Sequence, residues 1–581
     1  MNSRFAAAVV SLLLFANSLF SATDPFQKYL DWRYHPPNMH IRDIQGLQER
    51  VVDGKLHLRL REFLELVLKN SADIQMTRLD IFTAANSVIS ANAPFDQNLA
   101  LGFNTLRSVS PLSFFTLGGN NTTSGTPNIG TPTTSPGQTV GTGGGQLPGG
   151  SQVILPQTIS SLAQNSFATY TQLLPTGQSI TGNFSVNRSS GDGYYFPTLF
   201  GSTNITITQH LLQNRSNIQA RGPQQIARTQ LLISSERSQA MIADAVTVAA
   251  RQYWNAIQLR DAIRVQEQNV DLARKSYAHD KQALDLGALA KLDIYQSETQ
   301  VAERNRDLIA ARYSYKAALD AMRRLIGADL TPALRSTEIV LEDDASALPP
   351  RSSILPFEQA LAKAVQSRPE NAAAQRQTSV DNLNARIARD ALLPQLDLSA
   401  QGGGSGPGFN QISVANNPSL TTNPYPGLGS TLGQVLAFNY PSYGFGLQLN
   451  FPFRNSTARA NLSNALVSRA RDQYAQRQTE QQIIFDVRSA INEIELADAS
   501  IQAAVQTRDL AQKNAAAEQQ KYELGTITAF EVLDSQTRLA SSESILLNSY
   551  VNYQQAYIDY QRATWTLLDG LGMVVEMPTV H

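Results

Sequence analysis

The residues best suited to chemistry in this sequence are two glycine-rich segments and six histidines. The segment GTGGGQLPGG (141–150) lacks the lysine and the Ser/Thr with which a phosphate-binding loop holds phosphates and Mg²⁺. The segment GGGSGPG (402–408) resembles a nucleophile elbow, but Pro407 displaces its final glycine. The histidines are dispersed, and the one close pair, His35 and His40, flanks two prolines. We therefore expect no catalytic residue, no metal site and no cofactor, and the chain is not expected to be an enzyme.

Composition narrows the possible classes further. The chain has 581 residues, a formal net charge of −1 and no cysteine. The missing cysteines exclude a disulfide framework, a thiol nucleophile, a zinc–cysteine site and a lipid-anchored N-terminal cysteine. The near-neutral charge and the lack of a Lys/Arg block argue against nucleic acid as a partner.

The N-terminus predicts export from the cytoplasm. Arg4 supplies a positive start, the run from Phe5 to Phe20 is apolar, and Ser21 or Ala22 offers a small residue for cleavage. An uncleaved membrane anchor is the alternative, but the run is shorter than the roughly 20 apolar residues that a membrane span needs. No later stretch resembles a transmembrane helix, so a mature protein held in a membrane is expected to be there as β-strands.

The strongest pattern is a tandem repeat. The segment LGALAKLDIYQSETQVA, from Leu286, aligns without gaps with LGTITAFEVLDSQTRLA, from Leu524. Apolar residues on both sides of each LG pair recur in threes and fours, which is typical of coiled-coil helices. The proline-free segment from Asn455 to Glu523 would reach on the order of 100 Å as a helix. Each copy is therefore predicted to hold two long helices joined at an LG turn, where glycine suits a helix C-terminus.

Each copy also opens with a shorter helix that ends at a proline, Pro94 or Pro394, and strand-like alternation follows. Return strands are predicted at 204–208 and 444–451, with one apolar face and one polar or small face. This pattern fits a strand between lipid and water, although a half-buried strand of a soluble sheet would look the same. Four strands are too few to close a pore, so an oligomer is expected.

Polar segments rich in Gly, Pro, Ser and Thr separate the strands, at 107–175 and 402–441, and are predicted to be loops. An alternating segment, Ile180 to Val186, is expected to extend the first hairpin outside the membrane. The predicted divisions of the chain are a signal peptide (1–22), an N-terminal extension (23–58), a first repeat (59–327), a linker (328–356), a second repeat (357–572) and a C-terminal tail (573–581).

Taken together, these features resemble the TolC family of outer-membrane efflux proteins over essentially the whole mature chain. The resemblance rests on the tandem repeat, the proline-ended opening helices, the helical hairpins and the two LG-x5-[DE] turns, which end at Asp293 and Glu531. The segment TQHLLQNRSNIQA also resembles the family's strand-to-helix entry, with His210 where proline is common.

The resemblance implies a mainly α protein with membrane β-structure. Long coiled-coil helices would form a periplasmic α-barrel, and a trimer would share a twelve-stranded outer-membrane β-barrel with four strands per chain. Its implied partners are two further copies of the chain, a periplasmic adaptor (membrane fusion protein), indirectly an inner-membrane pump of RND or ABC type, and outer-membrane lipid. The implied location is the outer membrane of a Gram-negative-type bacterium, spanning into the periplasm.

The resemblance also implies site residues at the periplasmic end. The adaptor-contact candidates are Leu286, Gly287, Leu524 and Gly525. The periplasmic aperture candidates are Asp293, Tyr522, Glu531 and Asp534, whose carboxylates would form an acidic ring in three copies. A solvated helix face is the alternative for these carboxylates. The basic gate residue of some relatives would fall at Ile527, so this chain lacks that residue for a salt-bridge latch.

The function implied is passive conduction from an adaptor and pump to the exterior, in efflux or type I secretion, with closed tips that open like an iris. The energy would come from another protein. A structural or adhesive coiled-coil trimer, anchored by a β-barrel, is the alternative; the duplicated hairpins argue against it.

Overall fold

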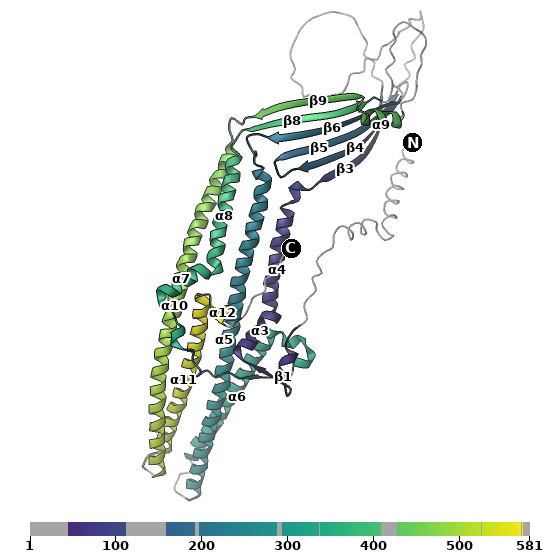
Figure 1. Ribbon diagram of the computed structural model, residues 1–581. Helices are drawn as coiled ribbons and strands as arrows, with labels where there is room; N and C mark the ends of the chain where they lie inside the picture. Colours follow the sequence, from purple (N-terminus) through teal and green to yellow (C-terminus); the bar gives the residue numbers. More distant parts are fainter. Residues whose placement is uncertain are drawn as a thin grey trace, which may run out of the picture. The chain divides into compact units, whose positions relative to one another are not determined.

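Two long helical hairpins dominate the chain (Figure 1). The computed structural model describes residues 44–111, 158–191, 197–286, 293–335, 337–407, 427–524, 526–570 and 572. Helices α5 (Ile218–Asp285) and α10 (Ser456–Glu523) each have 68 residues, and they are followed by α6 (Asp293–Ile326) and α11 (Ala529–Ala563). At about 1.5 Å per residue, 68 residues extend on the order of 100 Å. The predicted long helices and their tandem arrangement are confirmed.

The chain divides into two compact units that share these helices. Unit 1 comprises Met1–Gln75, Val248–Leu348 and Ser500–Gln555, and unit 2 comprises Met76–Thr247, Pro349–Ala499 and Ala556–His581. The predicted signal peptide and C-terminal tail lie outside the described residues. Among the helices of the described ranges, none combines the length and the hydropathy that a membrane crossing requires.

A broken helix opens each repeat. The first repeat has α3 (Leu60–Asn70) and α4 (Ala72–Ser90), separated at Ser71, and then the short helix η2 (Ala93–Phe95), which contains Pro94. The second repeat has α7 (Phe357–Ser367) and α8 (Pro369–Asp390), separated at Arg368 because Pro369 cannot donate the hydrogen bond that would continue α7. Unit 2 also contains the short helices η5 (Arg351–Ser353) and α12 (Leu567–Gly570).

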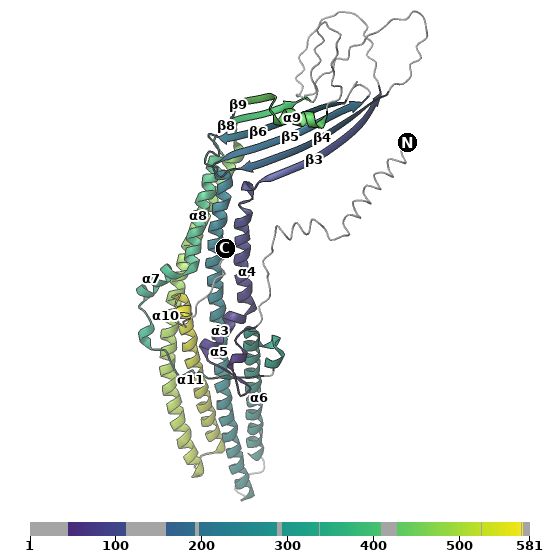
Figure 2. The ribbon, with the colours of Figure 1, turned by 45° about the vertical axis from the view of Figure 1, so that its right-hand side comes forward.

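Unit 2 contains a six-stranded antiparallel sheet in the order β3-β4-β5-β6-β8-β9. Its strands are β3 (Asn98–Pro111), β4 (Thr158–Leu173), β5 (Gln178–Gly191), β6 (Thr198–His210), β8 (Gln395–Gly406) and β9 (Tyr440–Asn450). Both views show the strands side by side (Figures 1 and 2). The four predicted strands, β3, β6, β8 and β9, are all present.

Strands β4 and β5 correct the prediction of four strands per chain. Strand β4 lies within the segment 107–175 that was predicted to be a loop. The pattern did not reveal this strand, because its apolar residues do not alternate regularly and it follows a glycine-rich run. The segment Ile180–Val186 does not extend the hairpin; it is part of β5, which pairs along its length with β4 and β6. The chain therefore adds a hairpin between the two strands predicted for the first repeat.

A short helix, α9 (Leu428–Leu436), packs on β6 and β8, within the predicted loop 402–441. Its side chains Thr431 and Val435 are fully buried. Glycines on the two strands make room for the helix. A Cβ atom at Gly201 would lie 2.8 Å from Thr431 Cγ2 and 2.9 Å from Val435 Cγ2, which is closer than real Cβ contacts.

We expect Gly201→Val to displace α9, because overpacking costs about 1–3 kcal/mol. Amide hydrogen exchange across 428–436 should accelerate about tenfold or more, since about 1.4 kcal/mol corresponds to a factor of ten. Gly433→Val is the matched control, because a Cβ atom at Gly433 meets nothing within 4 Å. Equal exchange rates in the two variants would contradict this packing.

Unit 1 contains a three-stranded sheet that joins the beginning of the chain to the segment between the repeats. Strands β1 (Val51–Val52) and β2 (Lys55–Leu58) pair antiparallel, and β2 pairs parallel with β7 (Glu338–Leu341). The short helices η1 (Gln48–Arg50), η3 (Ala328–Leu330) and η4 (Pro332–Leu334) lie in the same two segments. The predicted linker 328–356 therefore contains a strand that the sequence pattern did not reveal.

The core of unit 1 surrounds Tyr253 of α5, which is fully buried. Its ring centroid lies 5.8 Å from that of Phe63, on α3. Its hydroxyl oxygen lies 3.0 Å from Leu58 O and 2.8 Å from Asp343 Oδ2. Burial, followed by the charge of Asp343 and the hydrogen bond to it, raises the pKa of Tyr253, so the phenol stays protonated and can donate. This contact fixes α5 to both segments of the small sheet.

Candidate functional site

The turns that end the two helical hairpins expose a leucine each. Leu286 follows α5 and is 85% exposed, and Leu524 follows α10 and is 79% exposed. Their partners in the predicted LG pairs, Gly287 and Gly525, lie outside the described residues. Burying a leucine side chain is favourable by about 1.5–3 kcal/mol, so two such side chains at helix ends are suited to contact another protein.

The turn after α10 is held by local hydrogen bonds. The Thr526 amide donates to Lys521 O at 3.0 Å, a spacing that is typical of a helix ending in a Schellman motif. The Thr528 amide donates to Glu531 Oε2 at 3.3 Å, and the Glu531 amide donates to Thr528 O at 3.2 Å. Thr528 is therefore the N-cap residue of α11, and Glu531 is the third helical residue, the acidic position of a capping box.

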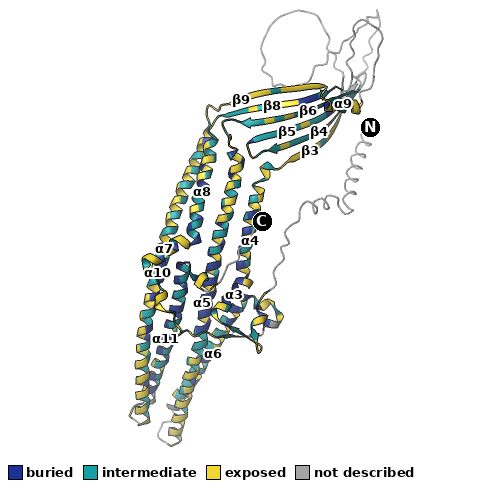
Figure 3. Ribbon diagram, viewed as in Figure 1, coloured by how far each residue is buried: buried dark blue, intermediate teal, exposed yellow. Residues whose placement is uncertain are grey.

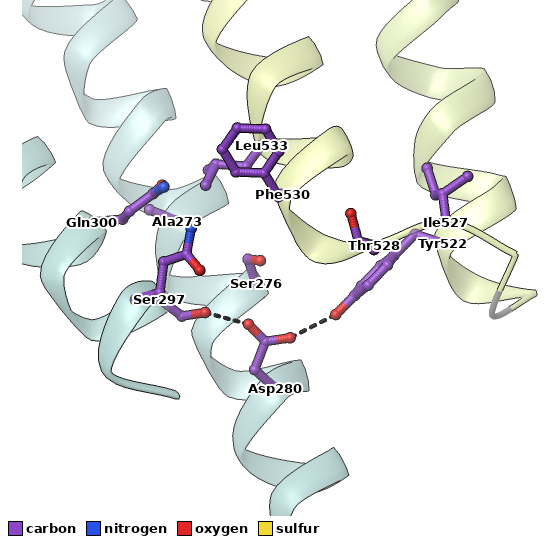
Figure 4. A pocket seen from close by; sticks show the side chains of 11 residues that line it. Ala273, Ser276, Asp280, Ser297, Gln300, Tyr522, Ile527, Thr528, Phe530 and Leu533 are labelled. Carbon is purple, nitrogen blue, oxygen red and sulfur yellow. Dashed lines mark hydrogen bonds between the residues drawn. The ribbon is translucent and has the colours of Figure 1, made fainter. Parts of the chain in front are cut away.

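A buried carboxylate joins the two hairpins near their turns (Figure 4). Asp280, on α5, is only 2% exposed. The Tyr522 hydroxyl, on α10, donates to Asp280 Oδ1 at 2.5 Å, and the Ser297 hydroxyl, on α6, donates to Asp280 Oδ2. Three helices from both repeats thus meet at one side chain. A buried charge needs such donors, because burying it unpaired is costly.

The phenol of Tyr522 is held in its neutral form. Burial, followed by the hydrogen bond to Asp280 and the negative charge of that residue, raises the pKa of Tyr522. His279 Nδ1 lies 3.0 Å from the Tyr522 hydroxyl oxygen, and the two ring centroids are 4.9 Å apart. Since the phenol proton is directed to Asp280, the contact with His279 is satisfied when the imidazole donates from Nδ1. The cluster His279, Asp280, Ser297 and Tyr522 is named the tip cluster below.

A pocket of about 370 Å³ lies beside the tip cluster. It is lined by Asp280 and Tyr522 together with apolar residues that include Ile527, Phe530 and Leu533 (Figure 4). Phe530 is 63% exposed. The pocket between the two hairpins therefore combines apolar walls with the hydrogen bond between Tyr522 and Asp280.

The predicted aperture residues have different surroundings. Tyr522 belongs to the tip cluster and lines the pocket, whereas Glu531 and Asp534 do not line it. Asp534 Oδ2 lies 2.7 Å from Arg538 Nη2, one helical turn later. Asp293 is the first residue of α6, and its side chain lies outside the described residues. The structure therefore brings Tyr522 together with Asp280, which was not predicted, and gives Glu531 and Asp534 local partners.

The tandem repeat carries a signal for Asp280. In the register that aligns Leu286 with Leu524, Asp280 aligns with Glu518, so both copies carry a carboxylate before the turn. Ser297, the second donor to Asp280, aligns with Ser535 in the same register. A carboxylate in a polar helix normally suggests a solvated face, and burial became evident only when the hairpins were placed together.

The paired helical hairpins and the amphipathic antiparallel sheet define the class of outer-membrane channels with a long helical portion. Residues 179–328 and 360–564, together more than half of the chain, match the family described as outer membrane efflux protein. The chain belongs to this family, its location is the outer membrane, and it is a transport channel that works with efflux systems.

Individual relatives are distant. The chain is 24% identical over 404 residues to the outer membrane efflux protein BepC of Brucella suis, covering 68% of this chain and 76% of BepC. It is 24% identical over 321 residues to the outer membrane protein TolC of Escherichia coli, covering 55% of this chain and 60% of TolC. The solved outer membrane channel CmeC of Campylobacter jejuni shares the fold, with a TM-score of 0.57, 11% identity, and coverage of 91% of this chain and 94% of CmeC.

Proposed function

We propose that three copies of this chain form the outer-membrane channel of a tripartite efflux or type I secretion system. A periplasmic adaptor would contact the channel, and an inner-membrane pump of RND or ABC type would supply the energy. Membership of the efflux family supports transport over the structural or adhesive stalk. The observation that carries the mechanism is the tip cluster, because it ties the hairpins of both repeats through a buried carboxylate.

The channel is proposed to open when the two hairpins separate at this end. Parting α10 from α5 breaks the bond between Tyr522 and Asp280, and it exposes Asp280 to water. The cost of the broken bond is offset by hydration of the freed carboxylate, so the two arrangements can differ by a few kcal/mol. An adaptor that binds the separated hairpins more tightly than the joined ones would open the channel.

The adaptor is proposed to dock on the leucine turns. Support comes from Leu286 and Leu524, which are the two most exposed leucines among the described residues. Gly287 and Gly525 share the proposal by their place in the LG pairs.

Cross-linking tests this docking directly, because the chain has no cysteine of its own. Leu286→Cys and Leu524→Cys, each labelled with a benzophenone maleimide, should give light-dependent conjugates with the adaptor in cells. Val467→Cys, at a position on α10 that is 65% exposed, is the control and should give none. Labelling without conjugates at both leucines, while efflux is intact, would reject the docking site.

The acidic aperture formed by Asp293, Glu531 and Asp534 remains a proposal, and Glu531 allows its two possible roles to be separated. Glutamine can replace glutamate at the third helical position of a capping box, so Glu531→Gln removes the charge and keeps the start of α11. Glu531→Ala removes both and should destabilise the helix start by about 1 kcal/mol.

If the carboxylates line the pore, Glu531→Gln and Asp534→Asn should each weaken block by divalent cations in a planar bilayer. Equal block in the wild type and in both neutral variants would leave only the capping role.

A further inference from the structure

We infer that each copy of this chain contributes six strands to the outer-membrane barrel, so that a threefold assembly has eighteen strands and a correspondingly wide bore. This inference rests on the proposed threefold channel. It concerns β4 and β5, which lie between the two strands predicted for the first repeat.

The β4–β5 hairpin pairs with its neighbours, β3 and β6, along nearly their whole length. Strand β4 pairs with β3 from Asn98↔Thr171 at one end to Pro111↔Thr158 at the other, and β5 pairs with β6 from Gln178↔Gln209 to Ser189↔Thr198. The two strands have 16 and 14 residues, more than the roughly 9–11 that a tilted membrane strand needs. They are therefore long enough to cross the membrane beside β3 and β6.

The turn between β4 and β5 is tight and fixed to the start of the long helix α5. The Leu174 amide donates to Gln178 O at 2.8 Å, and Gly177 adopts the left-handed conformation with φ of 92°. The Asn217 side-chain amide, just before α5, donates to Leu174 O at 3.1 Å. Channels of this kind have short turns at the periplasmic end and long loops outside. The tight β4–β5 turn therefore fits the periplasmic end of the sheet, next to the start of α5.

Of the two added strands, β5 continues the apolar and polar faces of the sheet. One row across all six strands contains Leu99, Tyr170, Gly182, Ile205, Gly402 and Tyr443. The adjacent row contains Ala100, Thr169, Asn183, Asn204, Gly403 and Ser442. The first row is apolar apart from glycine, and the second is polar or small. This is the alternation of a strand with lipid on one side and water on the other. Strand β5 follows it through Ile180, Phe184 and Val186, whereas β4 carries polar side chains on both faces and takes its place in the sheet by pairing with β3 and β5.

The edges of the sheet indicate what completes it. Strands β3 and β9 are the two edges of the sheet. They run in opposite directions, because they are the first and last of six strands that are all antiparallel to their neighbours. Both strands are largely exposed (Figure 3). Their exposed apolar side chains include Phe103 at 61% and Phe445 at 87%. Unpaired backbone groups are not tolerated in hydrocarbon, and six strands are fewer than the eight of the smallest single-chain barrels. We assign β9 of one copy as the partner of β3 of the next, which keeps every pair antiparallel.

The strand number sets the bore. Barrel diameter grows roughly linearly with strand number, so eighteen strands give a barrel about 1.5 times as wide as twelve. With strands about 4.8 Å apart and tilted about 40°, the radius is about 18 Å for eighteen strands and about 12 Å for twelve. Barrels of sixteen to eighteen strands hold a water-filled channel, so this barrel would not be the narrow point for cargo.

The test is a distance between copies in the full-length protein. Ser442→Cys, on the exposed strand β9, is spin-labelled, and electron–electron distances are measured in the purified assembly in lipid nanodiscs. Threefold geometry predicts about 31 Å between equivalent backbone positions for eighteen strands and about 21 Å for twelve. The matched comparison is a variant that lacks Thr158–Gly191, which contains β4 and β5, so that β3 can pair with β6. This deletion should shorten the distance between copies by about a third.

A second measurement separates this inference from the proposed trimer. Paired cysteines at Leu99, on β3, and Leu449, on β9, are scanned with their neighbours for disulfides between copies. Cross-linked trimers together with the longer distance support eighteen strands. Cross-linked trimers with a distance near 21 Å overturn the inference but keep the channel. Full-length assemblies that never cross-link into trimers overturn both. If the deletion variant does not fold, the distance in the full-length protein still decides.

Discussion

Tyr522→Phe should raise the single-channel conductance of this protein in a planar bilayer. The variant removes only the hydroxyl that donates to Asp280 Oδ1, and a hydrogen bond to a charged group is worth about 1.5–3 kcal/mol. The proposed mechanism makes this bond only when the hairpins are joined. Losing it should therefore shift the balance toward the open arrangement by about 10-fold to 150-fold in each copy. Asp280→Asn should act in the same direction, because it removes the charge that both hydroxyls bind.

A matched variant guards against a general effect of removing a tyrosine hydroxyl. Tyr313, on α6, is 69% exposed, and Tyr313→Phe should leave conductance unchanged. Trimers should remain intact in all three variants by native electrophoresis. If intact Tyr522→Phe and Asp280→Asn channels conduct like the wild type, the tip cluster is not a gate.

Arg562→Ala should markedly destabilise unit 2. Arg562 is near the end of α11, and its side chain is 11% exposed. Its guanidinium donates to Glu370 Oε1 at 2.6 Å and to Asp244 Oδ1 at 2.7 Å, and it lies 5.0 Å from the Trp565 ring centroid. The hydrogen bond to Glu370, whose side chain is 28% exposed, joins two charged groups and is worth about 1.5–3 kcal/mol, whereas the bond to Asp244, whose side chain is 62% exposed, adds at most about 1 kcal/mol.

The neighbouring arginine extends this cluster of charges. Arg368, which is 8% exposed, pairs with Glu370 at 3.2 Å and with Asp486 at 2.9 Å. Four helices, α5, α8, α10 and α11, therefore meet through these side chains. The loss in Arg562→Ala is measured by urea unfolding, followed by circular dichroism of the helices. Arg351→Ala is the control, because Arg351 is 67% exposed and a surface ion pair contributes about 0–1 kcal/mol. A similar small loss in both variants would contradict this assignment.

The same cluster predicts acid sensitivity. Burial alone would raise the pKa of Glu370, but the positive charges of Arg562 and Arg368 outweigh it and hold the pKa below its usual 4.5. A carboxyl with a lowered pKa stabilises the fold fully above its unfolded value, and this contribution is lost as the pH falls through the folded value. The stability difference between the wild type and Glu370→Gln should therefore shrink below about pH 4.5.

The long helices and four of the strands could be predicted because their patterns repeat. The proline-free segment from Asn455 to Glu523 corresponds almost residue for residue to α10, which begins at Ser456. Asn455 accepts a hydrogen bond from the Ala458 amide and so starts the helix. The alternation of Phe445, Leu447 and Leu449 likewise located β9. Such patterns extend over many residues, so tertiary contacts rarely override them.

Other elements depend on partners that are distant in sequence. Strand β7 has four residues and forms by pairing with β2, so its own segment carries too little pattern to reveal it. Strand β4 contains Ser, Thr, Gln and Asn on both faces, and its neighbours β3 and β5 determine its conformation. Asp280 was missed for a related reason: its donors come from α6 and α10, and no local feature distinguishes it from a solvated carboxylate.

The small sheet of unit 1 has a consequence for biogenesis. Leu60 and Asp343, whose hydrogen bond lies next to the pairing of β2 with β7, are 283 residues apart in sequence. During secretion the early strand therefore emerges long before its partner, and it must be shielded from other strands in the meantime. Contacts this distant in sequence form slowly and leave unpaired edges prone to aggregation. The three-stranded sheet of unit 1 can close only after the segment that holds β7 has been translocated, so the order of export delays the folding of this unit.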